Sequence, residues 1–266
     1  MVFNKLSGKY KAVTIATAVS VLILCVVLIS VFISANKNND KNNSQQTDVS
    51  SVVMSDSQLL SGDSCFLVVC NDDNAGDIVF MFLADFRVYS SKLILTPLSA
   101  DTLAADGRSY ADVYSYGGIN LLRDKIEEVR NVDIDKYAIL DRNGMSALTD
   151  LMGEVSLDVN ESFTYQSSDK SYEVEIGKTD MGSDMLFTYL KLYSQKYGPD
   201  KFVSLVRDMI NTYLESIDVD DIEDTFAGLT NCFNTDVTIS DYFSALNDII
   251  YLVEHDMECV LTNDVD

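Results

Sequence analysis

Acidic side chains are the first candidates for chemistry, because the chain holds 42 Asp and Glu against 19 Lys and Arg. One run, DVDDIED at 218–224, raises the possibility of calcium binding. It lacks the glycine and the twelve-residue frame of an EF-hand loop. A solvated acidic helix start, favoured by the helix dipole, is the better interpretation. The run NDDN at 71–74 likewise indicates a loop rather than a cation site.

The charge balance and the rarity of two residue types exclude further classes of function. The formal net charge is −23 and the chain has only six arginines. Nucleic-acid binders use clusters of Lys and Arg on phosphates, so we expect no nucleic-acid partner. His255 is the single histidine, which excludes most His-based metal sites and Ser-His-Asp catalysis.

The cysteines point to no redox or metal motif, because no CxxC occurs. Cys65 and Cys70 lie five residues apart on one predicted strand, so their side chains point to opposite faces and cannot pair. Cys232 and Cys259 are either buried free thiols or a disulfide.

A membrane anchor is predicted at 12–35, a stretch of 24 residues without a charge. As a helix it spans roughly 36 Å, enough to cross a bilayer. A cleaved signal peptide fits less well, because its apolar region is shorter and ends at a cleavage site of small residues. Lys5, Lys9 and Lys11 precede the span without an acid among them, which places residues 1–11 in the cytoplasm.

The remaining chain is then outside the cell, in a linker and a domain. Residues 36–60 are rich in Asn, Ser and Gln and predict a disordered polar linker. Residues 61–266 form the predicted extracellular domain, and all 42 acidic residues follow the anchor. We therefore expect a single-pass protein of the cell membrane with an acidic exterior.

Short apolar and alternating runs predict the strands of this domain. The runs at 64–70 and 78–84 are apolar on both faces, as is typical of central strands covered by helices. The full set of predicted strands is 64–70, 78–84, 92–96, 136–140, 155–159 and 172–176.

Periodic apolar residues predict the helices that must cover the sheet. They lie at 119–129, 145–152, 185–197, 199–217, around 219–232, and from 241 to 255. Pro199 suits a first helical position, and Ser240 is expected to cap the last helix. The fold class is thus α/β, with a central sheet flanked by helices and a helical C-terminal part.

Five segments, taken in order, resemble the LytR-CpsA-Psr family of cell-envelope proteins. The segments are ILTPLSADT (94–102), VYSYGGINLL (113–122), VDIDKYAILDRNGMSALTDLMGEVSLDV (132–159), LFTYLKLY (186–193) and FNTDVTISDYF (233–243). The resemblance runs from about 64 to 246 and implies that family's extracellular α/β fold.

The resemblance also implies a reaction. Members of the family are thought to transfer anionic glycopolymers from a polyprenyl pyrophosphate to peptidoglycan. Such chemistry needs carboxylates that hold Mg²⁺ and arginines that clamp the pyrophosphate, beside an apolar cavity for the prenyl tail.

Both family carboxylates are present in this chain. Asp77 and Asp101 match the metal-type positions, and Asp101 also belongs to the catalytic motif. The arginines that accompany them in the family are Ala75 and Ala100 here. Without cations nearby, the two acids would repel each other unless a metal lay between them. They are a weak Mg²⁺ site, carboxylates kept by the fold, or ordinary loop acids.

The family's arginine clamp is mostly missing. Its Tyr-x-Arg-x-Arg helix matches Tyr189, Lys191 and Tyr193, so a catalytic lysine replaces one arginine and a tyrosine the other. Lys provides a point charge but not a planar fork. Arg142 could supply a cation from another direction, and Tyr116 could line the pocket or serve packing alone.

These departures predict a degenerate family member that binds or scaffolds lipid-linked cell-wall glycopolymers, or assists active paralogues, with little or no catalysis. The alternative is a divergent phosphotransferase in which Lys191, Lys201 or Arg142 replaces the missing arginines. A third hypothesis is a purely structural envelope protein whose cavity has closed.

Overall fold

The computed structural model describes most of the predicted extracellular domain. The described residues are 60, 62–72, 77–152, 155–159, 161–166, 170–214 and 232–264. The predicted anchor at 12–35, nearly all of the predicted linker and the acidic run at 218–224 lie outside this part. Among the described helices, none is long and apolar enough to cross a membrane.

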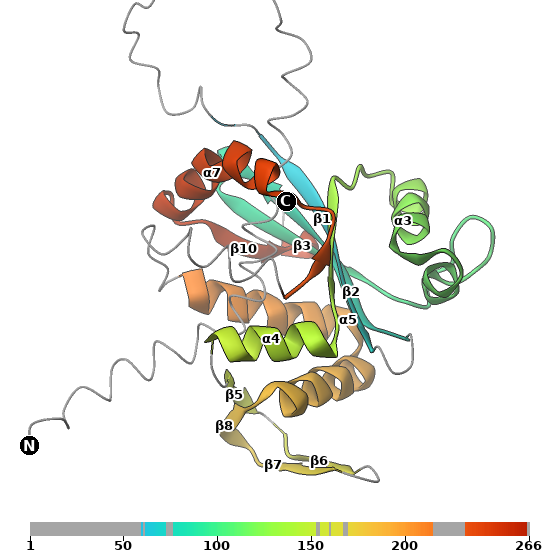
Figure 1. Ribbon diagram of the computed structural model, residues 1–266, viewed down its shortest axis with the longest axis vertical. Coiled ribbons are helices and arrows are strands. Elements are labelled where there is room, and N and C mark those ends of the chain that lie inside the picture. Colours follow the sequence, from blue (N-terminus) through green and yellow to red (C-terminus); the bar gives the residue numbers. More distant parts are fainter. Residues whose placement is uncertain are drawn as a thin grey trace, which may run out of the picture.

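A six-stranded mixed sheet forms the centre of the domain (Figure 1). Its strand order is β10 (Glu258–Leu261), β3 (Lys92–Leu98), β2 (Asp77–Arg87), β1 (Ser64–Asp72), β4 (Lys136–Leu140) and β9 (Asn234–Thr235). β1 pairs in parallel with β4, and β10 with β3, whereas the other neighbours are antiparallel. The four predicted central strands are confirmed. The carboxyl ends of β1, β3 and β4 and the amino end of β2 therefore meet at one end of the sheet.

Helices cover both faces of this sheet (Figure 1). α3 (Tyr110–Arg130) packs on one face, where Leu122 and Ile126 are fully buried against β1 and β2. α4 (Arg142–Met152), α5 (Ser183–Leu214) and α7 (Ile239–Glu254) share the larger core on the other face. The predicted mixed α/β architecture is confirmed.

Two helix starts differ from prediction. α3 begins nine residues earlier than expected, at Tyr110, because Ser109 caps it and only Gly118, with φ of 67°, interrupts the helix. The prediction that Ser240 caps the last helix is wrong. Thr238 accepts from the Asp241 backbone N–H while the Asp241 carboxylate accepts from the Thr238 N–H, which makes a capping box.

Two small antiparallel sheets lie beside the first part of α5, away from the central sheet (Figure 1). They pair β5 (Val155–Val159) with β8 (Gly177–Met181), and β6 (Phe163–Gln166) with β7 (Ser171–Val174). The strand predicted at 172–176 ends at Val174, because the chain turns before Gly177, whose φ is 109°.

α5 consists of two helical segments joined at Gly198, whose φ of 75° is not helical. Pro199 follows directly and starts the second segment, as predicted. The second segment packs on the sheet through Phe202, whose ring stacks on Phe80 of β2 at 4.3 Å between centroids. The first segment extends from this anchor toward the small sheets.

Cys65, Cys70, Cys232 and Cys259 are free thiols. Of the two alternatives for Cys232 and Cys259, the structure supports buried free thiols. Cys70 faces the larger core and Cys65 the α3 side, so the two are on opposite faces of β1 as predicted.

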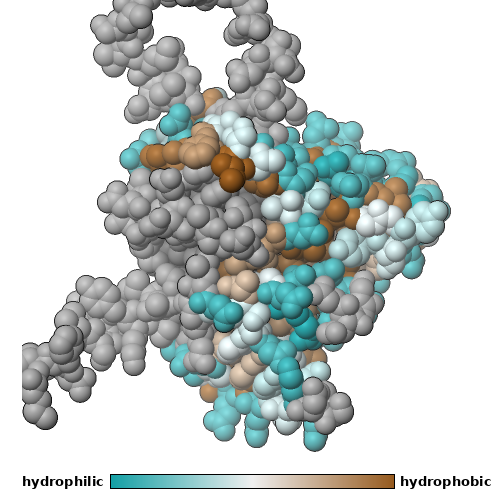
Figure 2. Space-filling model, viewed as in Figure 1, coloured by the Kyte–Doolittle hydropathy of each residue, from teal (hydrophilic) through white to brown (hydrophobic). Residues whose placement is uncertain are grey.

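Large apolar side chains are exposed at a few places on the surface. Figure 2 shows hydrophobic side chains over α7, where Ile239 and Phe243 are 69% and 64% exposed. Hydrophobic and hydrophilic side chains are mixed toward α3 on the same view. Ile239 and Phe243 lie one helical turn apart and form a small exposed apolar patch on α7.

Candidate functional site

The end of the sheet where β1 finishes carries an irregular ladder. The pairing of β1 and β2 shifts so that Val79 is an extra residue, and Asp72 stands directly opposite Asp77. Directly opposed residues in an antiparallel pair project to the same face. The Ser194 hydroxyl of α5 donates to the Val79 carbonyl oxygen at 2.8 Å, which ties the irregularity to the helix.

Asp72, the last residue of β1, is only 4% exposed and binds two cations. Arg142 donates from Nε to one carboxylate oxygen at 3.1 Å and from Nη2 to the other at 3.3 Å. Lys191 Nζ donates to the second oxygen at 2.9 Å. The buried carboxylate thus lies in the fork of the arginine, the geometry that Arg otherwise offers to a phosphate.

Asp184 binds the remaining side of the same arginine. Arg142 Nη1 donates to Asp184 Oδ1 at 3.0 Å, and its guanidinium lies over the Phe187 ring, 4.2 Å from the centroid. Lys170 and the Tyr172 hydroxyl donate to the other oxygen of Asp184. We call Asp72, Arg142, Lys170, Tyr172, Asp184 and Lys191 together the Asp72 cluster.

The electrostatics of the cluster favour its ionised form. The Arg142 hydrogen bonds, aided by Lys191, hold the pKa of Asp72 far below its ordinary value, although burial opposes this. Burial also acts against ionisation of Asp184, but the hydrogen bonds from Lys170 and Tyr172 lower its pKa overall. The Asp72 hydrogen bonds raise the pKa of Arg142. Both carboxylates therefore stay charged at neutral pH.

The first segment of α5 supplies this cluster from one side only. Asp184, Phe187 and Lys191 are spaced by three and four residues, which places them on one helical face. Tyr189, Tyr193 and Tyr197 are spaced by four and occupy the opposite face.

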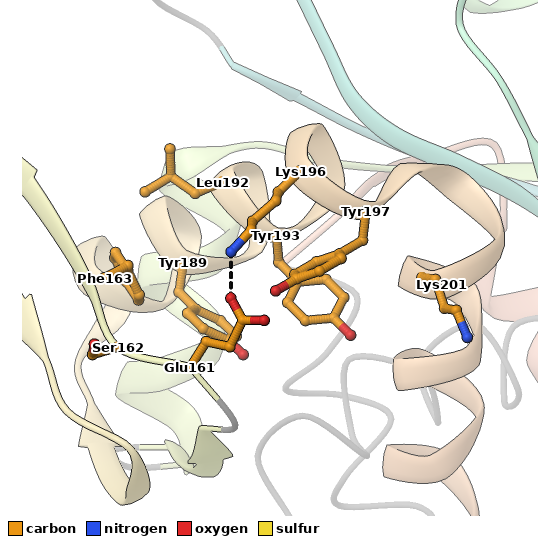
Figure 3. A pocket seen from close by; sticks show the side chains of 9 residues that line it. All are labelled: Glu161, Ser162, Phe163, Tyr189, Leu192, Tyr193, Lys196, Tyr197 and Lys201. Carbon is orange, nitrogen blue, oxygen red and sulfur yellow. Dashed lines mark hydrogen bonds and ion pairs between the residues drawn. The ribbon is translucent and has the colours of Figure 1, made fainter.

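A cavity of about 290 Å³ lies against this second face (Figure 3). We call it the tyrosine pocket; it is lined by Glu161, Ser162, Phe163, Tyr189, Leu192, Tyr193, Lys196, Tyr197 and Lys201. Tyr189 is 7% exposed, and burial raises its pKa to about 12. Its phenol is therefore protonated and can donate a hydrogen bond.

Four of the predicted site residues lie at the end of the sheet where β1, β3 and β4 finish. Arg142 and Lys191 meet at Asp72, and Asp77 lies beside them in the ladder with an exposed side chain. Asp101 is exposed in the turn after β3, where its backbone N–H donates to Ser99 Oγ at 3.3 Å.

The two predicted tyrosines lie in different environments. Tyr189 lines the tyrosine pocket, whereas Tyr116 is 81% exposed on α3, with Arg108 at 5.1 Å from its ring centroid. Within the described residues, no group of three or more His, Cys, Asp or Glu side chains is placed to hold a metal ion. Arg142 and Lys191 are placed to hold an anion, provided that Asp72 releases them.

Sequence reasoning missed Asp72 and Asp184. The run at 71–74 was interpreted as a loop, but Asp72 ends a strand and is buried. A charged residue directly after an apolar strand was the available signal, because such a carboxylate must find a cation when it is buried. The partners lie 70 and 119 residues away along the chain, beyond any local pattern.

The fold and the order of the five segments agree with one class of cell-envelope protein. The LytR_cpsA_psr family model matches residues 96–257. The chain belongs to the LytR-CpsA-Psr family.

Known relatives are distant. The Enterococcus faecalis protein named polyisoprenyl-teichoic acid–peptidoglycan teichoic acid transferase TagU is 21% identical over 133 residues, covering 48% of this chain and 43% of that protein. The chain thus matches less than half the length of this relative. A solved structure from Eubacterium siraeum has a TM-score of 0.63 at 16% identity, covering 82% of this chain and 89% of that one. TagV of B. subtilis has a TM-score of 0.58 at 14% identity, covering 75% and 84%. These two likenesses concern the fold alone.

Proposed function

We propose that this protein is a catalytically degenerate member of its family, which binds or scaffolds lipid-linked cell-wall glycopolymers, or active paralogues, at the outer face of the cell membrane. The anchor at 12–35 would hold it there with residues 1–11 in the cytoplasm. The named activity of TagU supports a glycopolymer as the ligand.

One observation carries the proposal: Asp72 occupies the cations that a pyrophosphate would need. The fork of Arg142 and the ammonium of Lys191 both bind this buried carboxylate, and Asp184 takes the third nitrogen of Arg142. A pyrophosphate must displace Asp72 and leave its charge buried without partners, which is costly.

The missing arginines point the same way. Ala100 and Tyr193 stand where the family resemblance expects Arg, and neither side chain can bind an anion by charge. Asp77 and Asp101 remain candidates for a weak Mg²⁺ site. Each is exposed, so water can solvate either carboxylate without a metal.

A transfer assay tests the proposal. The full-length chain in detergent micelles with Mg²⁺ should release no phosphate from geranylgeranyl pyrophosphate. Given a lipid-linked anionic glycopolymer as donor and peptidoglycan as acceptor, it should transfer no polymer. Clear turnover that Asp101→Ala abolishes would contradict catalytic degeneracy. Calorimetry should show weak binding of inorganic pyrophosphate, tightened about tenfold by Asp72→Asn, because the cations are freed.

The alternative, a divergent phosphotransferase, has one observation in its favour: two cations do converge where the sheet ends. In that case Asp72 would act as an exchangeable counter-ion. Turnover in the wild type, lost in Lys191→Met and in Arg142→Gln, would establish this alternative. The double variant with Ala100→Arg and Lys191→Arg should raise prenyl-pyrophosphate binding under either function if the family's lipid cavity persists, and unchanged binding would count against a retained lipid site.

A further inference from the structure

The tyrosine pocket lies on the side of α5 that the Asp72 cluster does not use. Its walls come from the first segment of the helix and from the residues that lead into β6, and Figure 3 shows their side chains around a common space. The volume of about 290 Å³ lies just below the range of about 300 to 1,000 Å³ that is usual for ligand sites in proteins. The pocket can therefore hold a small molecule or one unit of a larger one.

Aromatic rings dominate one wall. The centroids of Phe163 and Tyr189 are 5.3 Å apart, those of Tyr189 and Tyr193 5.8 Å, and those of Tyr193 and Tyr197 4.6 Å. Each tyrosine offers an apolar ring face and a hydroxyl at its edge. Such a surface suits a flat ligand with C–H groups on its faces and hydroxyls around its rim, which is the chemistry of a sugar ring.

Charged groups stand at the mouth. Glu161 forms an ion pair with Lys196, whose ammonium also lies 5.0 Å from the Tyr197 ring centroid. The hydrogen bond from Lys196 lowers the pKa of Glu161, so its carboxylate is ionised and accepts hydrogen bonds, as from neighbouring hydroxyls of a sugar. Lys201 adds a second, exposed cation to the lining just beyond the Gly198 kink.

Two lysines at one mouth are notable in a chain with a net charge of −23. The chain as a whole repels anions, and residues 208–266 contain neither Lys nor Arg. An acidic group on a ligand would find Lys201 here, beside the Lys196–Glu161 ion pair and the tyrosine hydroxyls.

Volume separates a sugar from a long lipid. The cavity has the volume of about ten water molecules at roughly 30 Å³ each. That space accepts a single sugar ring with its substituent, whereas a long polyprenyl chain exceeds it several-fold. The aromatic wall is also interrupted by hydroxyls, which a hydrocarbon chain would leave without partners.

We propose that the tyrosine pocket binds one saccharide ring that carries an acidic substituent, a carboxylate or a phosphate. The ring packs on Tyr189 and Tyr193, its hydroxyls reach Glu161, and its acidic group faces Lys201. This inference rests on the proposed function, since a cell-wall glycopolymer would supply the sugar, and it adds the position of the site and the charge of the ligand.

Saturation-transfer NMR on the full-length chain in detergent micelles tests it with four probes: glucose, glucuronate, glucose 6-phosphate and farnesyl phosphate. The two acidic sugars should bind with Kd on the order of 1 mM, and glucose several-fold more weakly. Preference for the carboxylate or for the phosphate tells which acidic group the pocket takes. No binding of either acidic sugar by the wild type would overturn the proposal.

Variants locate the binding. Lys201→Glu, on an exposed side chain, should remove the preference for acidic sugars while leaving glucose binding in place. Tyr193→Ala should weaken every sugar more than tenfold, with Tyr197→Ala as a second variant should the first fail to fold. The matched controls are Lys178→Ala on β8 and Tyr89→Ala, a 60% exposed tyrosine just after β2, and both should bind as the wild type does. Equal binding by wild type, Lys201→Glu and Tyr193→Ala would overturn the proposal.

Farnesyl phosphate decides between sugar and lipid. Displacement of glucuronate by farnesyl phosphate, with the same dependence on Tyr193, would make the pocket a lipid site and overturn the saccharide inference. The proposed function fails separately, through turnover in the transfer assay. Sugar binding without turnover supports both, and turnover with sugar binding retains only the pocket.

Discussion

The two faces of the first segment of α5 differ in how far their polar groups are already satisfied. On one face, Lys191 and Asp184 join Arg142 and Asp72 in a set of short contacts. On the other face, three tyrosines line open volume, and the only ion pair among the described charged groups beside them is the exposed one of Lys196 with Glu161. A charged side chain is therefore open to a ligand only where no buried residue of the chain already binds it.

The Asp72 cluster contributes to stability, whereas the tyrosine pocket is available for binding. The Asp72 cluster stabilises the junction of β1, α4 and α5, and an anion must compete with it. The tyrosine pocket is open, so a ligand gains contacts there without breaking any in the Asp72 cluster. We therefore expect mutations on the two faces to act on different quantities.

Tyr189→Ala tests whether the pocket wall is also core, and it carries the largest expected effect. Tyr189 is 7% exposed and packs between Phe163 and Tyr193. Its truncation should lower the free energy of unfolding by about 3 kcal/mol. Urea denaturation monitored by circular dichroism measures this. Tyr189→Phe, which keeps the ring, is the control and should change stability little.

Asp72→Asn removes the negative charge at the centre of the Asp72 cluster. Removing the carboxylate leaves Arg142 and Lys191 without their buried acceptor, so stability should fall by about 2 kcal/mol. Asp77→Asn, directly opposite in the ladder but exposed, is the matched control, with a change within about 0.5 kcal/mol. Equal effects of the two variants would show that the cluster contributes no special stability.

The pH dependence of the Asp72→Asn effect on stability tests whether the pKa of Asp72 is lowered in the folded state. The folded-state pKa of Asp72 is lowered from 3.8, so its contribution is complete above the unfolded pKa and is lost as the pH falls toward the folded value. The stability difference between wild type and Asp72→Asn should be constant from pH 7 to 5. It should shrink by about 1 kcal/mol at pH 3. A constant difference down to pH 3 would contradict the lowered pKa.

Lys196→Met carries the smallest expected effect. The ion pair with Glu161 is exposed on both sides, at 59% and 57%, and exposed pairs contribute little to stability. Thermal unfolding should therefore show no measurable change. A clear loss of stability would mean that the mouth of the pocket is a structural contact rather than an open rim.

Local patterns predicted most of the fold. Apolar runs located β1 to β4, and periodic residues located α4 and both segments of α5, because these elements bury one face or both. The sequence did not reveal the extra residue at Val79, which changes the face that Asp77 occupies. It also did not reveal that β7 ends at Val174 and that β8 begins at Gly177 after a turn.

The candidate site was predictable only in part. Arg142 and Lys191 were identified as the cations that could replace lost arginines, and they do converge. Asp72 was missed, because its burial follows from pairing with residues far along the chain. The tyrosine stripe was visible as a spacing of four from Tyr189 to Tyr197, but a helical stripe alone does not distinguish core from pocket.

The parallel pairing of β10 with β3 has a consequence for how the chain acquires its structure. Glu258 pairs with Lys92, so the sheet is complete only when a segment some 166 residues downstream reaches it. Contacts of such long sequence separation slow folding, because the loop must close before the strands can pair. During synthesis, β3 therefore remains an open edge until the chain beyond residue 258 has emerged, and an unpaired edge of this kind is open to pairing with other chains.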